Sequence, residues 1–244
     1  MKLFDRLGKL RDRRPYCTMI VPAAGESRRM GGGNKLLLPL EGEPVLAHTL
    51  RAIDAATLVD EIILSTRTEC LAEMAELCQK CSLQKPVRVV VGGETRTHSV
   101  LAAALEANED VEYLAVHDGA RPLVLPEQVD DLIRLGQRTY AVAPAVPVTD
   151  TVKVADLSGL VLSTPDRSTL FAVQTPQVFQ ANLLKAALQS AIAAEAPLTD
   201  DCSAVERLGK DVYLTPGWRE NIKITTPEDL SVAELFLRRR EVQA

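Results

Sequence analysis

Residues 17–35 read CTMIVPAAGESRRMGGGNK, an apolar run followed at once by a loop of small and basic residues. The run from Cys17 to Pro22 predicts a buried strand. Glycines and alanines let a backbone approach phosphate closely, and Arg28, Arg29 and Lys35 bring cationic side chains to the same place. The spacing is neither that of a Walker loop nor that of GxGxxG. Because ligands of open α/β sheets bind at the carboxyl ends of strands, the stretch predicts a polyphosphate site.

Outward from this stretch, strand-like runs alternate with helical patterns over the first 145 residues, which is typical of βαβ units. The predicted strands are Cys17 to Pro22, Glu61 to Thr66, Val87 to Val91, Tyr113 to His117 and Ala141 to Ala145. The predicted helices are Val45 to Ala56, Glu69 to Cys81, Thr97 to Ala107 and Glu127 to Arg138. We therefore predict an α/β fold with a doubly wound, mostly parallel sheet.

This alternation breaks between residues 146 and 174, where short β-like pieces flank Asp156-Leu-Ser-Gly159. A turn of this composition between such pieces indicates a hairpin, so we predict an arm at about 146–174 rather than a second domain. The elements predicted after it are helices at Ala181 to Ala194 and Asp200 to Leu208, a strand at Val212 to Thr215 and a helix from Pro227. The predicted organisation is a basic N-terminal extension over residues 1–14 and a single domain over residues 15–244.

The composition excludes several classes of protein. Hydrophobic residues make up 46% and charged residues 25% of the 244-residue chain, as in a soluble globular domain. The net charge of −5 argues against nucleic-acid binding, although residues 1–14 hold six basic and two acidic residues. We interpret them as a solvated extension, with a weak contact to acidic lipid as the alternative. No apolar region of signal or membrane-spanning length is found, so we predict a cytoplasmic protein with no membrane.

Five cysteines form an odd set, which favours reduced thiols in a cytoplasm. Cys78 and Cys81 make a CxxC, but a structural zinc site needs a second pair of ligands at suitable spacing. Both continue an apolar stripe with Leu71 and Met74, which is typical of a helix face packed on a core. We therefore predict buried thiols rather than metal or redox chemistry.

Blocks of residues distributed along the chain resemble one enzyme family. The loop VPAAG at 21–25 with Arg29-Met30 and Lys35 looks like the signature of the sugar-nucleotide type nucleotidyltransferases. The further blocks are GGETRTHSV at 92–100, VHDGARP at 116–122, VPVTDTVK at 146–153, DR at 166–167, QTPQVF at 174–179, LTDD at 198–201 and NIKITTPED at 221–229. In this order and spacing they resemble the 2-C-methyl-D-erythritol 4-phosphate cytidylyltransferases, over nearly the whole chain after residue 15.

This resemblance implies a reaction and a set of roles. The family joins CTP to a polyol phosphate, releasing pyrophosphate and giving a CDP-polyol, in non-mevalonate isoprenoid precursor synthesis. The roles it implies are catalysis for Arg29, Lys35 and Lys223; nucleotide binding for Ala23, Ala24, Gly25, Gly93, Glu94, Ser99 and Asp118; and binding of the polyol phosphate for Arg121, Thr151, Arg167 and Thr175. Asp118 would also ligate Mg²⁺, the implied cofactor. Thr151 and Arg167 would come from the arm of a second subunit, so the resemblance implies a homodimer through the arm.

Two departures and two rival functions remain open at this point. Leu36 and Glu94 differ from residues common in the family at those positions, which puts contacts to base and phosphate in doubt. A ribitol 5-phosphate cytidylyltransferase would have a similar site, and so would a non-catalytic nucleotide-binding regulatory protein of this fold. None of the three histidines receives a catalytic role, since an attacking phosphate oxygen is already ionised at neutral pH.

Overall fold

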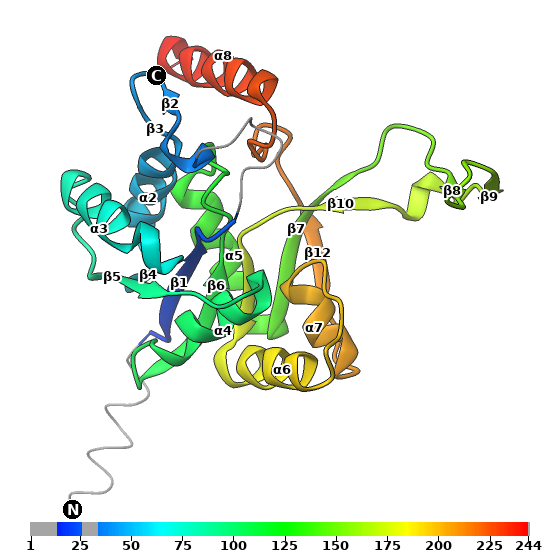
Figure 1. Cartoon of the computed structure of the whole chain (residues 1–244), viewed down its shortest axis with the longest axis horizontal. Coiled ribbons are helices and arrows are strands. Elements are labelled where there is room, and N and C mark those ends of the chain that lie inside the picture. Colours follow the sequence, from blue (N-terminus) through cyan, green and yellow to red (C-terminus); the bar gives the residue numbers. More distant parts are fainter. Residues whose placement is uncertain (1–13, 26–33, 244) are drawn as a thin grey trace, which may run out of the picture.

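The computed structural model describes residues 14–25 and 34–243, and these build a twisted sheet with helices on both faces (Figure 1). In spatial order its strands are β5 (Val87–Val91), β4 (Glu61–Thr66), β1 (Tyr16–Pro22), β6 (Val111–Val116), β11 (Gln177–Gln180) and β7 (Ala141–Pro147), with β10 (Phe171–Val173) and β12 (Tyr213–Pro216) both pairing with β7. Strands β5, β4, β1 and β6 are parallel to one another, whereas β11 is antiparallel to both of its neighbours. The predicted α/β class with a mostly parallel sheet is confirmed.

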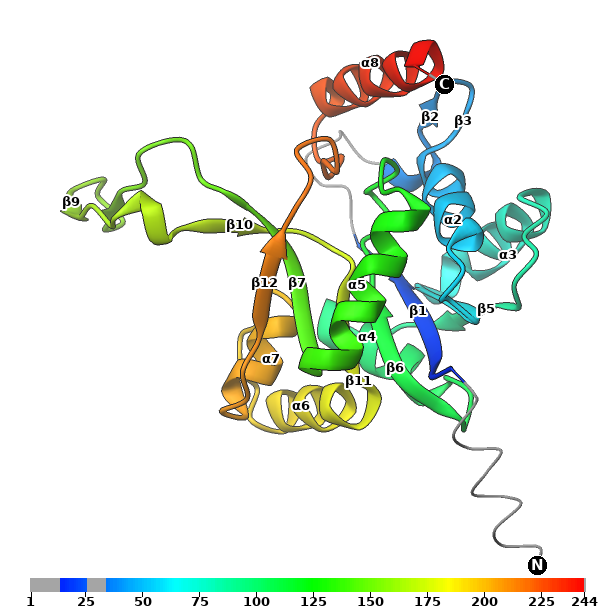
Figure 2. The same ribbon diagram turned by 180° about the vertical axis from the view of Figure 1, so that it is seen from behind.

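The helices divide between the two faces of the sheet. One face carries α2 (Val45–Ala55), α3 (Leu71–Lys80) and α5 (Pro126–Thr139), and the other carries α4 (Arg96–Leu105), α6 (Ala181–Ala193) and α7 (Asp201–Arg207). Helix α8 (Pro227–Gln243) lies against a short hairpin of β2 (Pro39–Leu40) and β3 (Glu43–Pro44) (Figure 2). Short 3₁₀ turns occur at η2 (Lys35–Leu37), η3 (Thr68–Cys70) and η4 (Arg167–Thr169).

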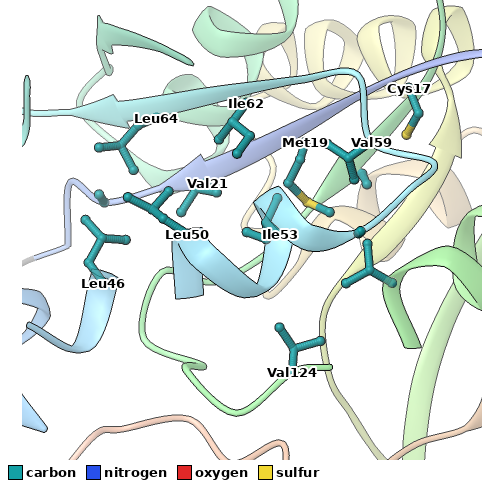
Figure 3. Close-up of a cluster of buried hydrophobic side chains, with 14 of the residues drawn as sticks. Cys17, Met19, Val21, Leu46, Leu50, Ile53, Val59, Ile62, Leu64 and Val124 are labelled. Carbon is teal, nitrogen blue, oxygen red and sulfur yellow. The ribbon is translucent and has the colours of Figure 1, made fainter. Parts of the chain in front are cut away.

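Strand β1 is buried on both faces because its side chains alternate between two cores. Figure 3 shows Met19 and Val21 turned toward Leu50 and Ile53 of α2. Ile20, between them in sequence, packs in the opposite core with α4 and α6. Residues 23–25, which follow β1, are therefore joined to a strand that solvent does not reach.

The observed bounds of the predicted elements differ from the predicted ones by at most two residues, and several short elements were not predicted, among them η3, the β2/β3 hairpin and β11. Glu69 to Cys81 was predicted as one helix, but η3 precedes α3 in the structure. Strand β11 was not predicted, because a four-residue strand that follows a proline and has glutamine at both ends gives little periodic signal. In α3 the predicted stripe is present: Met74 and Cys81 are buried and Cys78 is half-buried. All five cysteines are free thiols, and Cys17, Cys81 and Cys202 are buried.

The predicted hairpin is present at the tip of the arm. Strands β8 (Val154–Ala155) and β9 (Val161–Ser163) pair antiparallel, and the turn between them closes with Gly159 at a φ of 89°. Only glycine adopts this left-handed conformation readily. Figures 1 and 2 show the arm extending well beyond the sheet from β7 and β10.

The predicted N-terminal extension lies outside the described residues up to residue 13, and Arg14, its last residue, forms a salt bridge of 2.7 Å with Asp60. Over residues 14–25 and 34–243, the structure contains no helix with the length and apolar composition to cross a bilayer.

The order of the strands determines where a ligand can bind. The chain runs from β1 outward through β4 to β5, and then returns to the opposite side of β1 as β6. Such a reversal leaves a crevice beyond the carboxyl ends of β1 and β6, because the connecting segments diverge there. Gly25 follows β1 and Asp118 follows β6, so both lie at this crevice.

Candidate active site

A cavity of about 670 Å³ opens at this crevice. Nine of the predicted site residues line it: Ala23, Ala24, Gly25, Lys35, Gly93, Glu94, Ser99, Asp118 and Lys223. They come from the segments after β1, β5 and β6, from η2 and α4, and from the segment before α8. The volume is within the range of small-molecule sites.

The first wall of the cavity is the segment after β1. Ala23 N–H donates to Ser65 O of β4 at 2.7 Å, which keeps the segment extended beyond the strand. Asn34 caps η2 by accepting from Leu36 N–H, and Lys35 begins this turn. The Lys35 ammonium donates to Ile224 O at 2.8 Å, so it reaches across to the segment that carries Lys223. Arg29 lies outside the described residues, and its role stays a prediction.

The second wall is the tight turn between β5 and α4. Gly93 N–H donates to Ser99 Oγ at 3.1 Å, and the Ser99 hydroxyl lies 3.0 Å from Thr95 O. A Cβ at Gly93 would stand 2.4 Å from His98 Cβ, so the turn requires glycine. Thr95 caps α4 by accepting from His98 N–H. Glu94 is exposed at the rim. The exposed backbone and ordered hydroxyl suit recognition of a small planar base.

Asp118 is the charged centre of the cavity. Lys223 Nζ lies 2.9 Å and Arg121 Nε 3.4 Å from Asp118 Oδ2, while Arg96 Nη2 lies 3.8 Å from Oδ1. Burial alone would raise the pKa of this carboxyl group, but the cations, Lys223 foremost, lower the pKa well below its ordinary value. Asp118 is therefore ionised at any physiological pH.

Behind Asp118, a buried hydrogen-bond chain fixes the backbone. Asp118 N–H donates to Thr175 Oγ1 at 3.0 Å, and Thr175 Oγ1 lies 3.0 Å from His117 Nδ1. The other ring nitrogen, Nε2, faces the carbonyl oxygen of Arg121, which can only accept. His117 Nε2 therefore carries the ring proton and donates it to Arg121 O at 3.1 Å, and in the neutral ring Nδ1 accepts from the Thr175 hydroxyl. Desolvation lowers the pKa of His117 to about 4, so the ring is neutral. Thr175 and Arg121 are thus buried against Asp118 rather than exposed in the cavity wall.

The segment that carries Lys223 is held by its own contacts to the core. Arg121 Nη1 donates to Asn221 O at 2.7 Å, and Asn221 Nδ2 donates to Thr175 O at 2.8 Å. Gln174 Nε2 donates to Trp218 O at 2.8 Å. These bonds explain why Lys223, distant in sequence, reaches Asp118.

The arm residues do not line the cavity of their own chain. Thr151 and Arg167 are exposed on the arm, and Arg167 Nη1 donates to Thr149 O at 3.1 Å. Exposed hydrophobic side chains accompany them on the arm: Val154, Leu157, Leu160, Val161, Leu162 and Phe171. The single chain therefore brings together the predicted nucleotide half of the site but not the predicted acceptor half.

Sequence reasoning missed two residues of this region. Arg96 lines the cavity, and its Nη2 donates to Asp201 Oδ2 at 2.7 Å. Asp201 is 1% exposed and begins α7. Arg96 lies in the block GGETRTHSV and Asp201 in the block LTDD, both of which contribute to the family resemblance. Membership of these blocks was the only signal in the sequence that could have indicated the two residues. A contact between residues 105 positions apart leaves no periodic pattern.

The donors available for a divalent cation fit magnesium bound through a nucleotide. In the described part of the chain, no group of three or more His, Cys, Asp or Glu side chains could hold a metal by itself. Asp118 supplies one ionised carboxylate beside a cavity lined by Lys35 and Lys223. Magnesium typically binds to one or two carboxylates together with substrate phosphates and water.

Comparisons with known proteins agree with this geometry. A solved structure of 4-diphosphocytidyl-2C-methyl-D-erythritol synthase from Anaerococcus prevotii superposes with a TM-score of 0.82 at 30% identity, covering 92% of this chain and 99% of its own. The 2-C-methyl-D-erythritol 4-phosphate cytidylyltransferase structure from Thermus thermophilus covers 91% of this chain and 99% of its own, with a TM-score of 0.73 and 29% identity. The fold and the cavity together define a nucleotidyltransferase.

The sequence comparisons narrow this class to one family. A sequence profile of 2-C-methyl-D-erythritol 4-phosphate cytidylyltransferase matches residues 17–239. Relatives of that name from Bacillus thuringiensis and Caldanaerobacter subterraneus are 45% and 44% identical, each over 90% of this chain and over 97% and 98% of their own lengths. The chain belongs to the 2-C-methyl-D-erythritol 4-phosphate cytidylyltransferase family, and it is a cytidylyltransferase of isoprenoid precursor synthesis.

Proposed function

We propose that this cavity binds CTP and transfers its cytidylyl group to 2-C-methyl-D-erythritol 4-phosphate. The observation that carries the proposal is the convergence of Lys35, Lys223 and Asp118 on one cavity beside a glycine turn. A phosphate oxygen of the acceptor attacks the α-phosphorus, the bond from that phosphorus to the bridging oxygen breaks, and pyrophosphate leaves. The products are the CDP-polyol and pyrophosphate, and no proton needs to be removed from the nucleophile.

The residues of the chain meet the demands of this reaction. Two anions must be brought together, so ammonium groups at Lys35 and Lys223 offset the repulsion and stabilise the charge that develops on the phosphates. Arg29 would add a third cation in the loop after β1. Ala23, Ala24 and Gly25 offer backbone at the phosphates, and Gly93, Glu94 and Ser99 hold the cytosine. Asp118 would hold Mg²⁺, which neutralises phosphate charge when bound.

The acceptor phosphate needs further cationic and hydroxyl donors. We propose that Arg167 and Thr151 of the partner subunit's arm supply them, while Arg121 and Thr175 support the site from behind Asp118. The arm of an isolated chain exposes Leu160, Leu162 and other hydrophobic side chains, which a second copy would cover. The proposed protein is thus a homodimer with shared sites. We place it in the cytoplasm, where five unpaired thiols remain reduced.

The acceptor is tested by measuring CTP-dependent release of pyrophosphate with a panel of polyol phosphates and Mg²⁺. We expect kcat/KM to be at least about tenfold higher for 2-C-methyl-D-erythritol 4-phosphate than for ribitol 5-phosphate. The two acceptors differ by a branching methyl group and a hydroxyl-bearing carbon, and about tenfold is the lower end of the discrimination that such differences produce. A ratio near one, or one that favours ribitol 5-phosphate, would overturn the proposed acceptor and leave the cytidylyl transfer in place. CTP binding without turnover on any acceptor would support a regulatory protein instead.

A further inference from the structure

A buried carboxylate outside the cavity is tied to the catalytic cluster. Asp201 is 1% exposed, and its carboxylate accepts from Arg96 Nη2 at 2.7 Å. Its backbone is fixed as well, since Asp201 N–H and Cys202 N–H both donate to Gln177 Oε1 at 3.2 Å. Gln177 is buried in β11. Asp201 therefore occupies a rigid position from which it acts on Arg96.

Arg96 stands between two carboxylates. The same nitrogen, Nη2, is 2.7 Å from Asp201 Oδ2 and 3.8 Å from Asp118 Oδ1. The shorter distance is a charge-assisted hydrogen bond, whereas the longer one exceeds hydrogen-bond length. Lys223 and Arg121 approach the other oxygen, Asp118 Oδ2. Oδ1 is thus the Asp118 oxygen that Arg96 would cover if it moved about 1 Å closer.

Stability alone is a weak reason to keep such a pair. Replacing a buried ion pair by apolar residues of similar volume is often neutral or stabilising, because desolvation of two charges offsets their attraction. A role in positioning is the better explanation. We propose that Asp201 is a positioning residue that holds Arg96 back from Asp118, which keeps Asp118 Oδ1 available for Mg²⁺ bound with the nucleotide. This inference rests on the proposed function of the cavity.

The test measures nucleotide binding rather than turnover. The dissociation constant of CTP is determined by calorimetry without acceptor, once in EDTA and once in saturating Mg²⁺. The constant in EDTA divided by the constant in Mg²⁺ is called the magnesium gain. For Asp201→Asn we expect the magnesium gain to fall at least about tenfold, since Arg96 moves onto Asp118 Oδ1, while the constant in EDTA changes less than about threefold. An unchanged gain, or equal weakening under both conditions, would overturn the positioning role.

A second substitution distinguishes positioning from simple damage. In Arg96→Gln combined with Asp201→Asn, the competing guanidinium is gone, so we expect the magnesium gain to return to within about threefold of wild type. A double variant as weak as Asp201→Asn alone would contradict the inference. The matched control is Glu206→Gln, which removes an exposed carboxylate from the same helix, α7, and leaves the Arg96–Asp201 pair intact. Its gain should equal that of wild type.

The remaining outcomes are also decisive. If Asp201→Asn does not fold, Arg96→Met with Asp201→Leu removes both charges together, and it should retain the magnesium gain. Loss of the gain in a folded apolar double variant would overturn the proposal. A wild-type protein that binds CTP with no magnesium gain would overturn the proposed metal role of Asp118, and the inference with it, before any variant is considered.

Discussion

The nucleotide cleft and the arm satisfy their side chains in opposite ways. In the cleft, Asp118, His117 and Arg121 are buried, and each forms hydrogen bonds or ion pairs with groups of the same chain. In the arm, Leu157, Leu160 and Leu162 are exposed. The cleft is ordered by contacts within the chain. The hydrophobic side chains of the arm are left uncovered by the described residues of the same chain.

This difference indicates which part of the protein binds each of the two substrates. A triphosphate and a base need groups fixed to within fractions of an ångström, and a rigid sheet edge provides them. The arm extends away from that edge (Figure 1), and its Arg167 and Thr151 are not among the residues that line the cavity of their own chain. If a second chain completes the site, binding of the acceptor depends on assembly. The following predictions test each side of this comparison.

The largest expected effect concerns the cleft. Lys35→Ala removes an ammonium group that spans the cavity to Ile224 O. Losing one positioned cation where charge develops should lower kcat by about 10²-fold or more. Steady-state pyrophosphate release measures it, with thermal unfolding to verify the fold. Lys80→Ala, at an exposed lysine of α3, is the control and should keep wild-type turnover. Near wild-type turnover of Lys35→Ala would remove Lys35 from the mechanism.

The second prediction sets the cleft against the arm. We expect Lys35→Ala and Arg167→Ala to be inactive separately and to regain activity when mixed, because one of the two sites in each heterodimer then has both residues. Random pairing of equal amounts should restore about a quarter of wild-type turnover. The measurement is activity after subunit exchange, with heterodimers verified by differential tagging.

A control for that experiment follows from the geometry of the cleft. Lys35 and Lys223 line the same cavity of a single chain. Mixing Lys35→Ala with Lys223→Ala therefore leaves every site with a defect, and no activity should return. Verified heterodimers of Lys35→Ala and Arg167→Ala that remain inactive would argue against shared sites, and the cleft would then stand alone as a catalytic unit.

The same comparison explains what the sequence can predict. Strand β1 and the position of the small and basic residues after it follow from local pattern, because apolar runs mark buried strands and ligands bind at the carboxyl ends of strands in open α/β sheets. Asp118 was assigned by resemblance. The turn at Gly159 is local too. Lys223 was assigned only by resemblance, since nothing near residue 223 indicates that this segment crosses to Asp118.

What escaped prediction depends on distant contacts. Strand β11 inserts between β6 and β7 against the direction of both, and its four residues carry no period that distinguishes them from a loop. The bond between Arg96 and Asp201 exists only because α4 and α7 cover the same face of the sheet. Such pairings are set by tertiary packing, and a single sequence does not encode them locally.

The smallest expected effect tests whether the interior of the cleft depends on a neutral histidine. The pKa of His117 is lowered from 6.5 to about 4 by burial. Between these values the unfolded chain binds a proton that the folded chain does not, so this contribution is complete above pH 6.5 and declines as pH falls toward 4. Between pH 7.5 and 5.5 we expect protonation of this histidine in the unfolded chain to lower the free energy of unfolding by about 1 kcal/mol.

The variant His117→Gln should lose that part of the pH dependence. The control is His98→Gln, at a histidine whose ring contacts Thr95 in an exposed position, and it should keep the pH dependence. Denaturant unfolding at both pH values gives the difference for each protein. If the free energy of unfolding falls equally for His117→Gln and for wild type between pH 7.5 and 5.5, burial does not lower the pKa of His117. The interior of the cleft would then be accessible to solvent, and the contrast with the exposed arm would be lost.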